Sequence, residues 1–186
     1  KTIVRIEPSM AFGTGTHETT RLCLKAIEKI YAGESFFDVG TGTGILAIAA
    51  AKIKSQVSSL KSQVAKSITQ NSKLKIQNSI LACDTDEDSV KIARENAALN
   101  GAENIEFYVG SIDENTSPFD FVCANLTADV IVPLLPLLVE KTEKTLLLSG
   151  ILSEQNDSVT GELRKLGMTD YKIEIDGEWI SVLAEK

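Results

Sequence analysis

The chain has 186 residues, of which 43% are hydrophobic and 24% are charged, and its formal net charge at pH 7 is -7. This length and composition indicate one globular domain with a substantial core and exclude a disordered chain. The acidic excess argues against a general nucleic-acid binder and favours a basic partner.

Strands and helices alternate along the chain, which predicts a mostly parallel sheet covered by helices on both faces. The expected strands start with an apolar one at Phe36 and continue at 80–84, 105–109, 119–124, 145–148, 172–175 and 179–184. The expected helices cover 19–31, 45–53, 86–100, 129–140 and 153–166. We expect Asp86 and Ser153 to cap their helices, Pro133 and Pro136 to interrupt theirs, and Asp176-Gly177 to join the last two strands as a hairpin.

The most informative segment is Phe36-Phe-Asp-Val-Gly-Thr-Gly-Thr-Gly44, a short strand followed by three alternating glycines and an alanine-rich helix. Glycines let the backbone turn sharply and bring its N–H groups close to a ligand. A carboxylate at Asp38 would repel a pyrophosphate but suits a cationic cofactor on Coulombic grounds. S-adenosylmethionine, with its sulfonium and α-ammonium groups, is therefore the better fit.

Two alternatives compete for this loop. Gly42, Gly44 and Ala47 can be read as a shifted dinucleotide fingerprint, although that register leaves Gly40 and Asp38 without a role. A glycine turn that binds nothing is the other alternative, but each glycine weakens the start of a helix by up to about 1 kcal/mol.

The second strand ends in Asp84, the position where adenosine-binding α/β folds place a carboxylate for the ribose hydroxyls. Gly40 and Asp84 are 44 residues apart, whereas about 20 is usual. Residues 54–79 explain the excess, because this low-complexity run of Ser, Gln, Lys and Asn contains near-repeats and resembles an insertion. We expect a solvated loop or a weak helix here; its five lysines make nucleic-acid contact the lesser alternative.

Glycines and hydroxyl groups gather in Met10-Ala-Phe-Gly-Thr-Gly-Thr-His-Glu-Thr-Thr20, just ahead of the first helix. This pattern predicts a lid whose hydroxyl groups bind polar ligand atoms or cap the helix. His17 is the only histidine, and no partner stands at metal-ligand spacing, so no metal is predicted; a role as a base stays open.

The fourth strand ends at Cys123-Ala-Asn125-Leu-Thr127, where ligands of such sheets bind. The side chain of Asn125 can orient a target amine or bond the cofactor, while simple turn formation is the alternative. The three cysteines lie far apart in apolar contexts, which argues against a disulfide framework and favours a reducing cytoplasm. There is no signal peptide or long apolar run, so neither export nor a membrane span is predicted.

Several segments together resemble the catalytic domain of the ribosomal protein L11 methyltransferase family, within the class I S-adenosylmethionine-dependent methyltransferases. They are the lid segment, the glycine loop with its helix, Ala93-Arg-Glu-Asn-Ala-Ala-Leu-Asn-Gly101, Ala124-Asn-Leu, Ser149-Gly-Ile-Leu and Gly177-Glu-Trp. The resemblance implies a Rossmann-like fold with a mostly parallel seven-stranded sheet and a C-terminal antiparallel hairpin. It implies cofactor contacts from Thr20, Gly40, Gly42, Asp84 and Asn125, and methyl transfer to amino groups, chiefly lysine ε-amines, of a ribosomal protein of the large subunit.

The family has an N-terminal domain that recognises the substrate, and we expect residues 1–186 to form the single methyltransferase domain without it. The alternatives are a cofactor-binding domain that is inactive without its substrate domain, a methyltransferase of another protein lysine, and an NAD-dependent oxidoreductase. No residue is an obvious dedicated base. We expect a cytoplasmic monomer with no direct nucleic-acid or membrane contact.

Overall fold

A computed structural model describes residues 3–7, 13, 15–65 and 79–186 of the chain. The remainder of the predicted lid and residues 66–78 of the predicted insertion lie outside the described residues. The strands are β1 (Phe36–Val39), β2 (Ile80–Asp84), β3 (Ile105–Val109), β4 (Phe119–Asn125), β5 (Thr142–Leu152), β6 (Asp170–Asp176) and β7 (Trp179–Glu185). The helices are α1 (Glu18–Ile30), α2 (Ile45–Ala65), α3 (Glu87–Leu99), α4 (Ala128–Glu140), a 3₁₀ turn (Ser153–Gln155) and α5 (Asn156–Lys165).

The strands form one sheet in the order β3-β2-β1-β4-β5-β7-β6. The first five strands in this order run parallel, and β7 joins β5 and β6 in antiparallel fashion. The predicted seven-stranded sheet with its C-terminal hairpin is confirmed. The strand order reverses between β1 and β4, the place where ligands bind in such folds.

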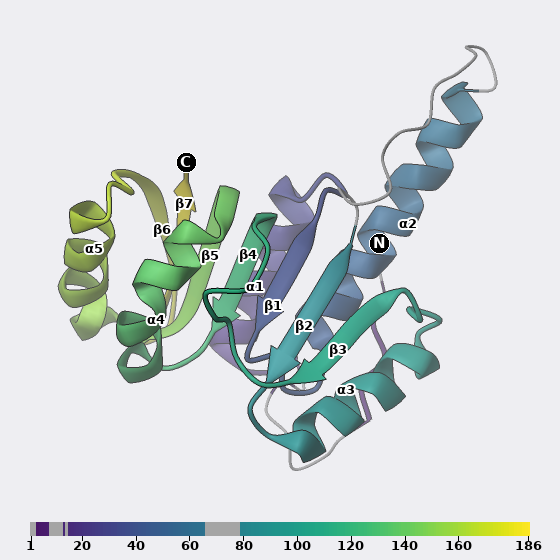
Figure 1. Cartoon of the computed structure of the whole chain (residues 1–186), viewed down its shortest axis with the longest axis horizontal. Helices are drawn as coiled ribbons and strands as arrows, with labels where there is room; N and C mark the ends of the chain where they lie inside the picture. The colour runs from purple at the N-terminus through teal and green to yellow at the C-terminus, as the bar shows by residue number, and fades with distance from the viewer. Residues whose placement is uncertain (1–2, 8–12, 14, 66–78) are drawn as a thin grey trace.

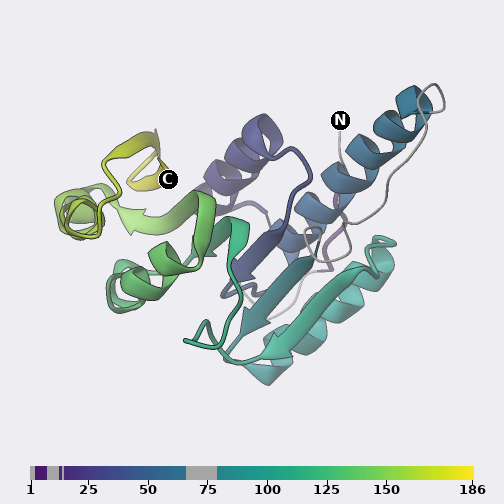
Figure 2. The same cartoon turned by 45° about the horizontal axis from the view of Figure 1, so that its top comes forward.

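Helices cover both faces of the sheet (Figures 1 and 2), and an apolar cluster lies on each face. One core cluster joins the sheet to α1, α2 and α3 and includes Ile27, Ile48 and Val90. The other joins it to α4 and α5 and includes Ile131 and Leu163. This arrangement leaves the carboxyl ends of the parallel strands accessible between the two helical layers. Among the described residues, no helix is long and apolar enough to cross a membrane.

The predicted helix 45–53 is too short, because α2 continues to Ala65. Residues 54–65 of the predicted insertion therefore extend this helix, which agrees with the helical alternative for that part. The segment holds no glycine or proline that would end a helix. Figure 1 shows the end of α2 projecting away from the sheet.

Two other predictions of local structure are wrong. Helix α4 is continuous across Pro133 and Pro136, because its buried face keeps it packed on the sheet although each proline removes one backbone donor. Ser153 does not cap an α-helix; it begins the 3₁₀ turn, and its hydroxyl donates to the carbonyl of Glu178 over 3.0 Å. Asp86 caps α3 as predicted, accepting from the N–H groups of Asp88 and Ser89.

Candidate functional site

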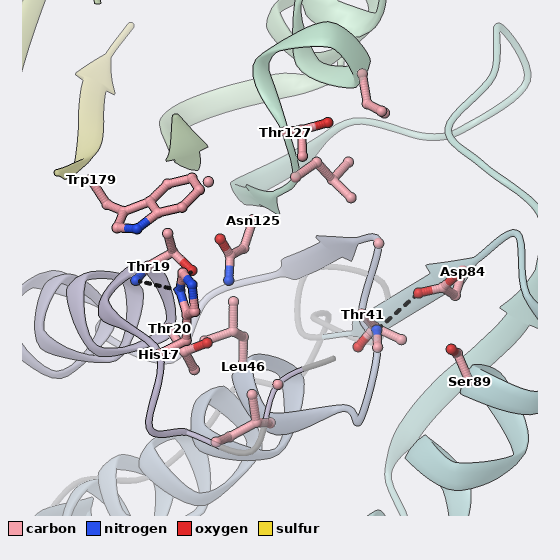
Figure 3. Close-up of a pocket in the computed structure, with 17 residues that line it drawn as sticks. His17, Thr19, Thr20, Thr41, Leu46, Asp84, Ser89, Asn125, Thr127 and Trp179 are labelled. Carbon is pink, nitrogen blue, oxygen red and sulfur yellow. Dashed lines mark hydrogen bonds between the residues drawn. The ribbon is translucent and has the colours of Figure 1, made fainter. Parts of the chain in front are cut away.

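A cavity of about 390 Å³ lies at the carboxyl ends of β1, β2 and β4, next to the start of α1. Its walls include all five residues predicted to bind a cofactor: Thr20, Gly40, Gly42, Asp84 and Asn125. Figure 3 shows Asp84 on one side of this cavity and Asn125, Thr20 and Trp179 on the other. The fold therefore brings together residues from four separate segments of the chain.

The glycine loop lies against the end of β2. The N–H groups of Gly40 and Thr41 both donate to the carbonyl of Cys83 over 2.9 Å. Gly40 has a φ of +77°, and a Cβ added there would lie 2.3 Å from Cδ2 of Leu126. The positive φ favours glycine, and any side chain there would also have to displace the end of Leu126, which gives Gly40 a role that the shifted dinucleotide register does not provide.

Asp84 connects the second strand to this loop. Its Oδ2 accepts a hydrogen bond from the N–H of Gly42 over 2.9 Å, and its Oδ1 accepts one from the N–H of Asp86 over 3.1 Å. The strands before it are in register, with Val39 opposite Cys83. The long connection between the loop and Asp84 thus leaves the carboxylate at the cavity, and its second lone pairs remain available to ligand hydroxyls.

Asp38, whose charge was expected to suit a cationic cofactor, is not among the residues that line the cavity. Its side chain is fully buried beneath the loop, where Oδ2 accepts from the hydroxyl of Thr41 over 2.7 Å and from the N–H of Ala47 over 3.2 Å. Burial raises the pKa of Asp38 to about 6, although the two hydrogen bonds oppose this rise. Asp38 fixes the loop to the first turn of α2.

Two side-chain oxygens at the cavity lack partners. Oγ1 of Thr20 and Oδ1 of Asn125 are buried and accept or donate no hydrogen bond among the described residues. Buried polar groups are nearly always paired, because an unpaired one costs about 1–3 kcal/mol. Their position indicates that a polar ligand completes these hydrogen bonds.

The described part of the lid lies over the glycine loop. The carbonyl of buried Gly13 accepts a hydrogen bond from the hydroxyl of Thr43 over 2.6 Å. The helix cap is His17 rather than a threonine, since its Nδ1 accepts from the N–H of Thr19 over 3.3 Å. The same nitrogen lies 2.9 Å from the hydroxyl of Thr19, so His17 has a structural role at the start of α1.

The cavity is also lined by apolar side chains. Trp179 lies edge-on to His17, with ring centroids 5.1 Å apart, and Leu126 and Val130 are further apolar residues that line the cavity. Sequence reasoning did not assign a site role to these cavity residues individually. The Gly177-Glu-Trp motif was the available signal for Trp179, but its proximity to His17 depends on how the hairpin packs.

Gly150 is another cavity residue that was not predicted. It has a φ of +83°, and a Cβ there would lie 2.2 Å from the carbonyl oxygen of Leu126. The absence of a side chain lets β5 pass close to the segment that follows Asn125.

No group of three or more His, Cys, Asp and Glu side chains placed to hold a metal occurs in the part of the chain that the structure describes. Cys23, Cys83 and Cys123 are buried free thiols. Burial raises the pKa of the Cys83 thiol to about 11, so it stays protonated at neutral pH.

The sequence matches the family model described as ribosomal protein L11 methyltransferase (PrmA) over residues 1–62 and 67–186. A relative named ribosomal protein L11 methyltransferase from Myxococcus xanthus is 39% identical over 95% of this chain and 55% of its own length. One of the same name from Caldicellulosiruptor bescii is 38% identical over 100% of this chain and 55% of its own. The chain thus spans about half the length of the curated relatives it matches.

Two solved structures are also similar to this chain. The crystal structure of ribosomal protein L11 methylase from Lactobacillus delbrueckii subsp. bulgaricus has a TM-score of 0.77 and 30% identity, covering 98% of this chain and 84% of that one. An RNA methyltransferase from Salinibacter ruber, in complex with S-adenosyl-L-homocysteine, has a TM-score of 0.61 at 17% identity, covering 89% and 90%. The second likeness concerns the fold alone.

Proposed function

Since this chain belongs to the ribosomal protein L11 methyltransferase family, we propose that it is the methyltransferase module of an S-adenosylmethionine-dependent enzyme. Its substrate is the ribosomal protein L11 of the large subunit, and the acceptors are amino groups, namely lysine ε-amines and also the N-terminal amine. The enzyme acts in the cytoplasm as a monomer, without direct contact to nucleic acid or membrane.

The observation that supports this proposal best is the pair of buried, unpartnered oxygens on Thr20 and Asn125 in the same cavity as Asp84. S-adenosylmethionine has an adenosine half, whose ribose carries two hydroxyls, and an amino-acid half with an ammonium and a carboxylate. A carboxylate on one side and two unsatisfied oxygens on the other match such a ligand. The residues present therefore fit the cofactor.

In this proposal, Asp84 holds the ribose hydroxyls, and the glycine loop at Gly40 and Gly42 allows the cofactor to approach the backbone. Thr20 and Asn125 bond the amino-acid end, and Asn125 is also suited to orient the acceptor amine. When bound, the cofactor supplies an electrophilic methyl group on a positively charged sulfur. The protein supplies position, since the cavity has no obvious dedicated base.

A lysine amine must be neutral to attack a methyl group, but its pKa in water is about 10.4. The apolar side chains of Leu126, Val130 and Trp179 that line the cavity disfavour an ammonium ion by desolvation and so lower the pKa of an entering amine. The lid at Gly13 helps to exclude water from this region. The proton of the lysine ammonium leaves to solvent or to a base away from these apolar side chains.

The net charge of -7 favours approach of a basic ribosomal protein over the acidic surface. This attraction is screened over about 8 Å at physiological ionic strength, so the KM for the protein substrate rises with salt. Affinity for the small cofactor depends much less on salt because its contacts are local.

The test combines calorimetry and mass spectrometry. S-adenosylhomocysteine binds this chain and NADH does not, and purified L11 incubated with the chain and S-adenosylmethionine gains multiples of one methyl mass on lysine or at its N-terminus. Binding without methylation of L11 would support a domain that is inactive without its substrate domain. Methylation of a different protein instead of L11 would show that L11 is not the substrate. Binding of NADH without binding of S-adenosylhomocysteine would refute the assignment of the chain as a methyltransferase.

A further inference from the structure

One arginine outside the cavity, Arg21, contacts both the segment at the start of α1 and the end of β6. In helix α1, Nη1 of Arg21 donates to the carbonyl of Thr16, and Nη2 donates to Oε1 of Glu18 over 3.1 Å. On its other side, Nε donates to Oδ2 of Asp176 over 3.1 Å, and Nη2 lies 3.0 Å from the same oxygen. The guanidinium therefore joins the base of the lid to the end of β6.

Both contacts lead directly to cavity residues. Thr16 precedes His17, and Asp176 is paired with Trp179 across the tight turn of the hairpin. His17 and Trp179 meet at the cavity with ring centroids 5.1 Å apart. Arg21 thus connects the backbone supports of two rings that form one wall.

We propose that Arg21 is a positioning residue for the wall that the rings of His17 and Trp179 form beside the entering amine. It acts by holding the Thr16–His17 backbone at a fixed distance from the hairpin that carries Trp179. This inference rests on the proposed function for its effect on the substrate. Its geometric part, the relation of Trp179 to His17, does not depend on catalysis.

A contribution to overall stability does not account for these contacts. The side chains of Arg21 and Asp176 are 39% and 26% exposed, and ion pairs of this kind contribute little to folding. The hairpin is already held by the pairing of β7 with β5 and by the N–H of Ser153, which donates to the carbonyl of Glu178 over 2.8 Å. What the guanidinium adds is a fixed distance between the hairpin and the lid.

The planar guanidinium has donors on two sides, so it reaches a carbonyl and two carboxylates at once. A lysine ammonium is a single point charge and does not span Thr16, Glu18 and Asp176 together. Arg21→Lys therefore keeps the positive charge but removes the planar arrangement of donors.

The chain provides a close control. Lys29 and Glu174 also join α1 to β6, with Nζ and Oε1 3.8 Å apart, but neither lines the cavity. Arg21→Gln and Lys29→Gln remove one ion pair each between the same two elements. Trp179 is the only tryptophan of the chain, so tryptophan fluorescence, excited selectively over the three tyrosines, reports on the surroundings of this ring alone.

In the experiment, fluorescence spectra, calorimetry with S-adenosylhomocysteine, and methylation kinetics with L11 are recorded for all variants. In Arg21→Gln and Arg21→Lys, we expect tryptophan emission to shift to longer wavelength and the KM for L11 to rise about tenfold, with the Kd for S-adenosylhomocysteine changed less than about twofold. Lys29→Gln keeps the wild-type spectrum and KM.

An unchanged spectrum in Arg21→Gln, the same change in Lys29→Gln, or full retention of wild-type behaviour by Arg21→Lys would overturn the inference. If the unaltered chain methylates nothing, the proposed function fails while the fluorescence comparison still decides the position of Trp179. Equal melting temperatures of the two Gln variants confirm that the comparison concerns geometry and not unfolding.

Discussion

Gly42 and Asp84 are joined by a 2.9 Å hydrogen bond from a backbone N–H to a carboxylate oxygen, although 42 positions separate them in the chain. The same carboxylate faces the cavity between the glycine loop and α3. One side chain therefore both shapes the loop and is available to the ligand.

Replacement of Asp84 should accordingly affect binding and stability together. In Asp84→Ala, we expect the Kd for S-adenosylhomocysteine to rise at least tenfold, or about 1.4 kcal/mol. Loss of the charge-assisted bond to Gly42 should lower the free energy of unfolding by about 1.5–3 kcal/mol. Titration calorimetry and urea unfolding measure the two effects. Asp88→Ala, at an exposed position in the first turn of α3, is the control, and equal affinities for both variants would contradict the assignment.

The close packing of Gly40 against Leu126 predicts a position-specific effect of an added methyl group. Gly40→Ala introduces both strain at φ +77° and a Cβ 2.3 Å from Leu126 Cδ2. Gly101→Ala has similar strain at φ +64° with nothing within 4 Å. We expect Gly101→Ala to cost about 1–2 kcal/mol without changing cofactor affinity, and Gly40→Ala to cost more and weaken binding. Thermal unfolding and calorimetry would show equal effects if the Leu126 contact were unimportant.

The buried carboxyl of Asp38 predicts a pH dependence of stability. Its pKa in the folded protein is about 6, above the unfolded value of 3.8, so the folded state binds the proton more tightly. The stabilisation from this group is fully present below pH 3.8 and is lost as the pH rises through 6. The total loss is roughly 3 kcal/mol at 1.36 kcal/mol per pKa unit.

Asp38→Asn removes this titration while keeping an oxygen for Thr41 and Ala47. Urea unfolding between pH 4 and pH 7.5 should show the wild-type free energy falling relative to that of the variant. Parallel profiles would mean that Asp38 ionises normally in the folded protein.

Asn125 and Asn156 both have a buried Oδ1 without a hydrogen-bond partner, but only Asn125 lines the cavity. Neither Asn→Ala change removes a bond made by that oxygen, so we expect unfolding free energies within about 1 kcal/mol of wild type. Asn125→Ala should reduce kcat/KM for methylation at least about 100-fold, or 2.7 kcal/mol, whereas Asn156→Ala leaves it unchanged. Steady-state kinetics with L11 check this, and near-normal activity of Asn125→Ala would exclude a role at the amine.

Much of the fold could be predicted from local patterns. The alternation of strands and helices, the glycine loop after β1, Asp84 at the end of β2 and the final hairpin each depend on residues close in sequence. The errors concern the continuity of one helix and the length of another. The prolines of α4 do not break the helix because its buried face is packed on the sheet, and the length of α2 was hidden by the polar composition of 54–65.

By itself, the sequence determined which residues stand at the ends of strands and where the backbone must turn, because backbone conformation and apolar periodicity are local properties. Only the tertiary structure decided that Thr20 and Asn125 leave unpaired oxygens in one cavity, that Asp38 is buried beneath the loop, and that His17 meets Trp179. These relationships depend on strand order and helix packing, which bring distant segments together and set the exposure of each side chain. A carboxylate that is two residues from a glycine loop in sequence can therefore be buried, while one that is 42 positions away bonds the loop directly.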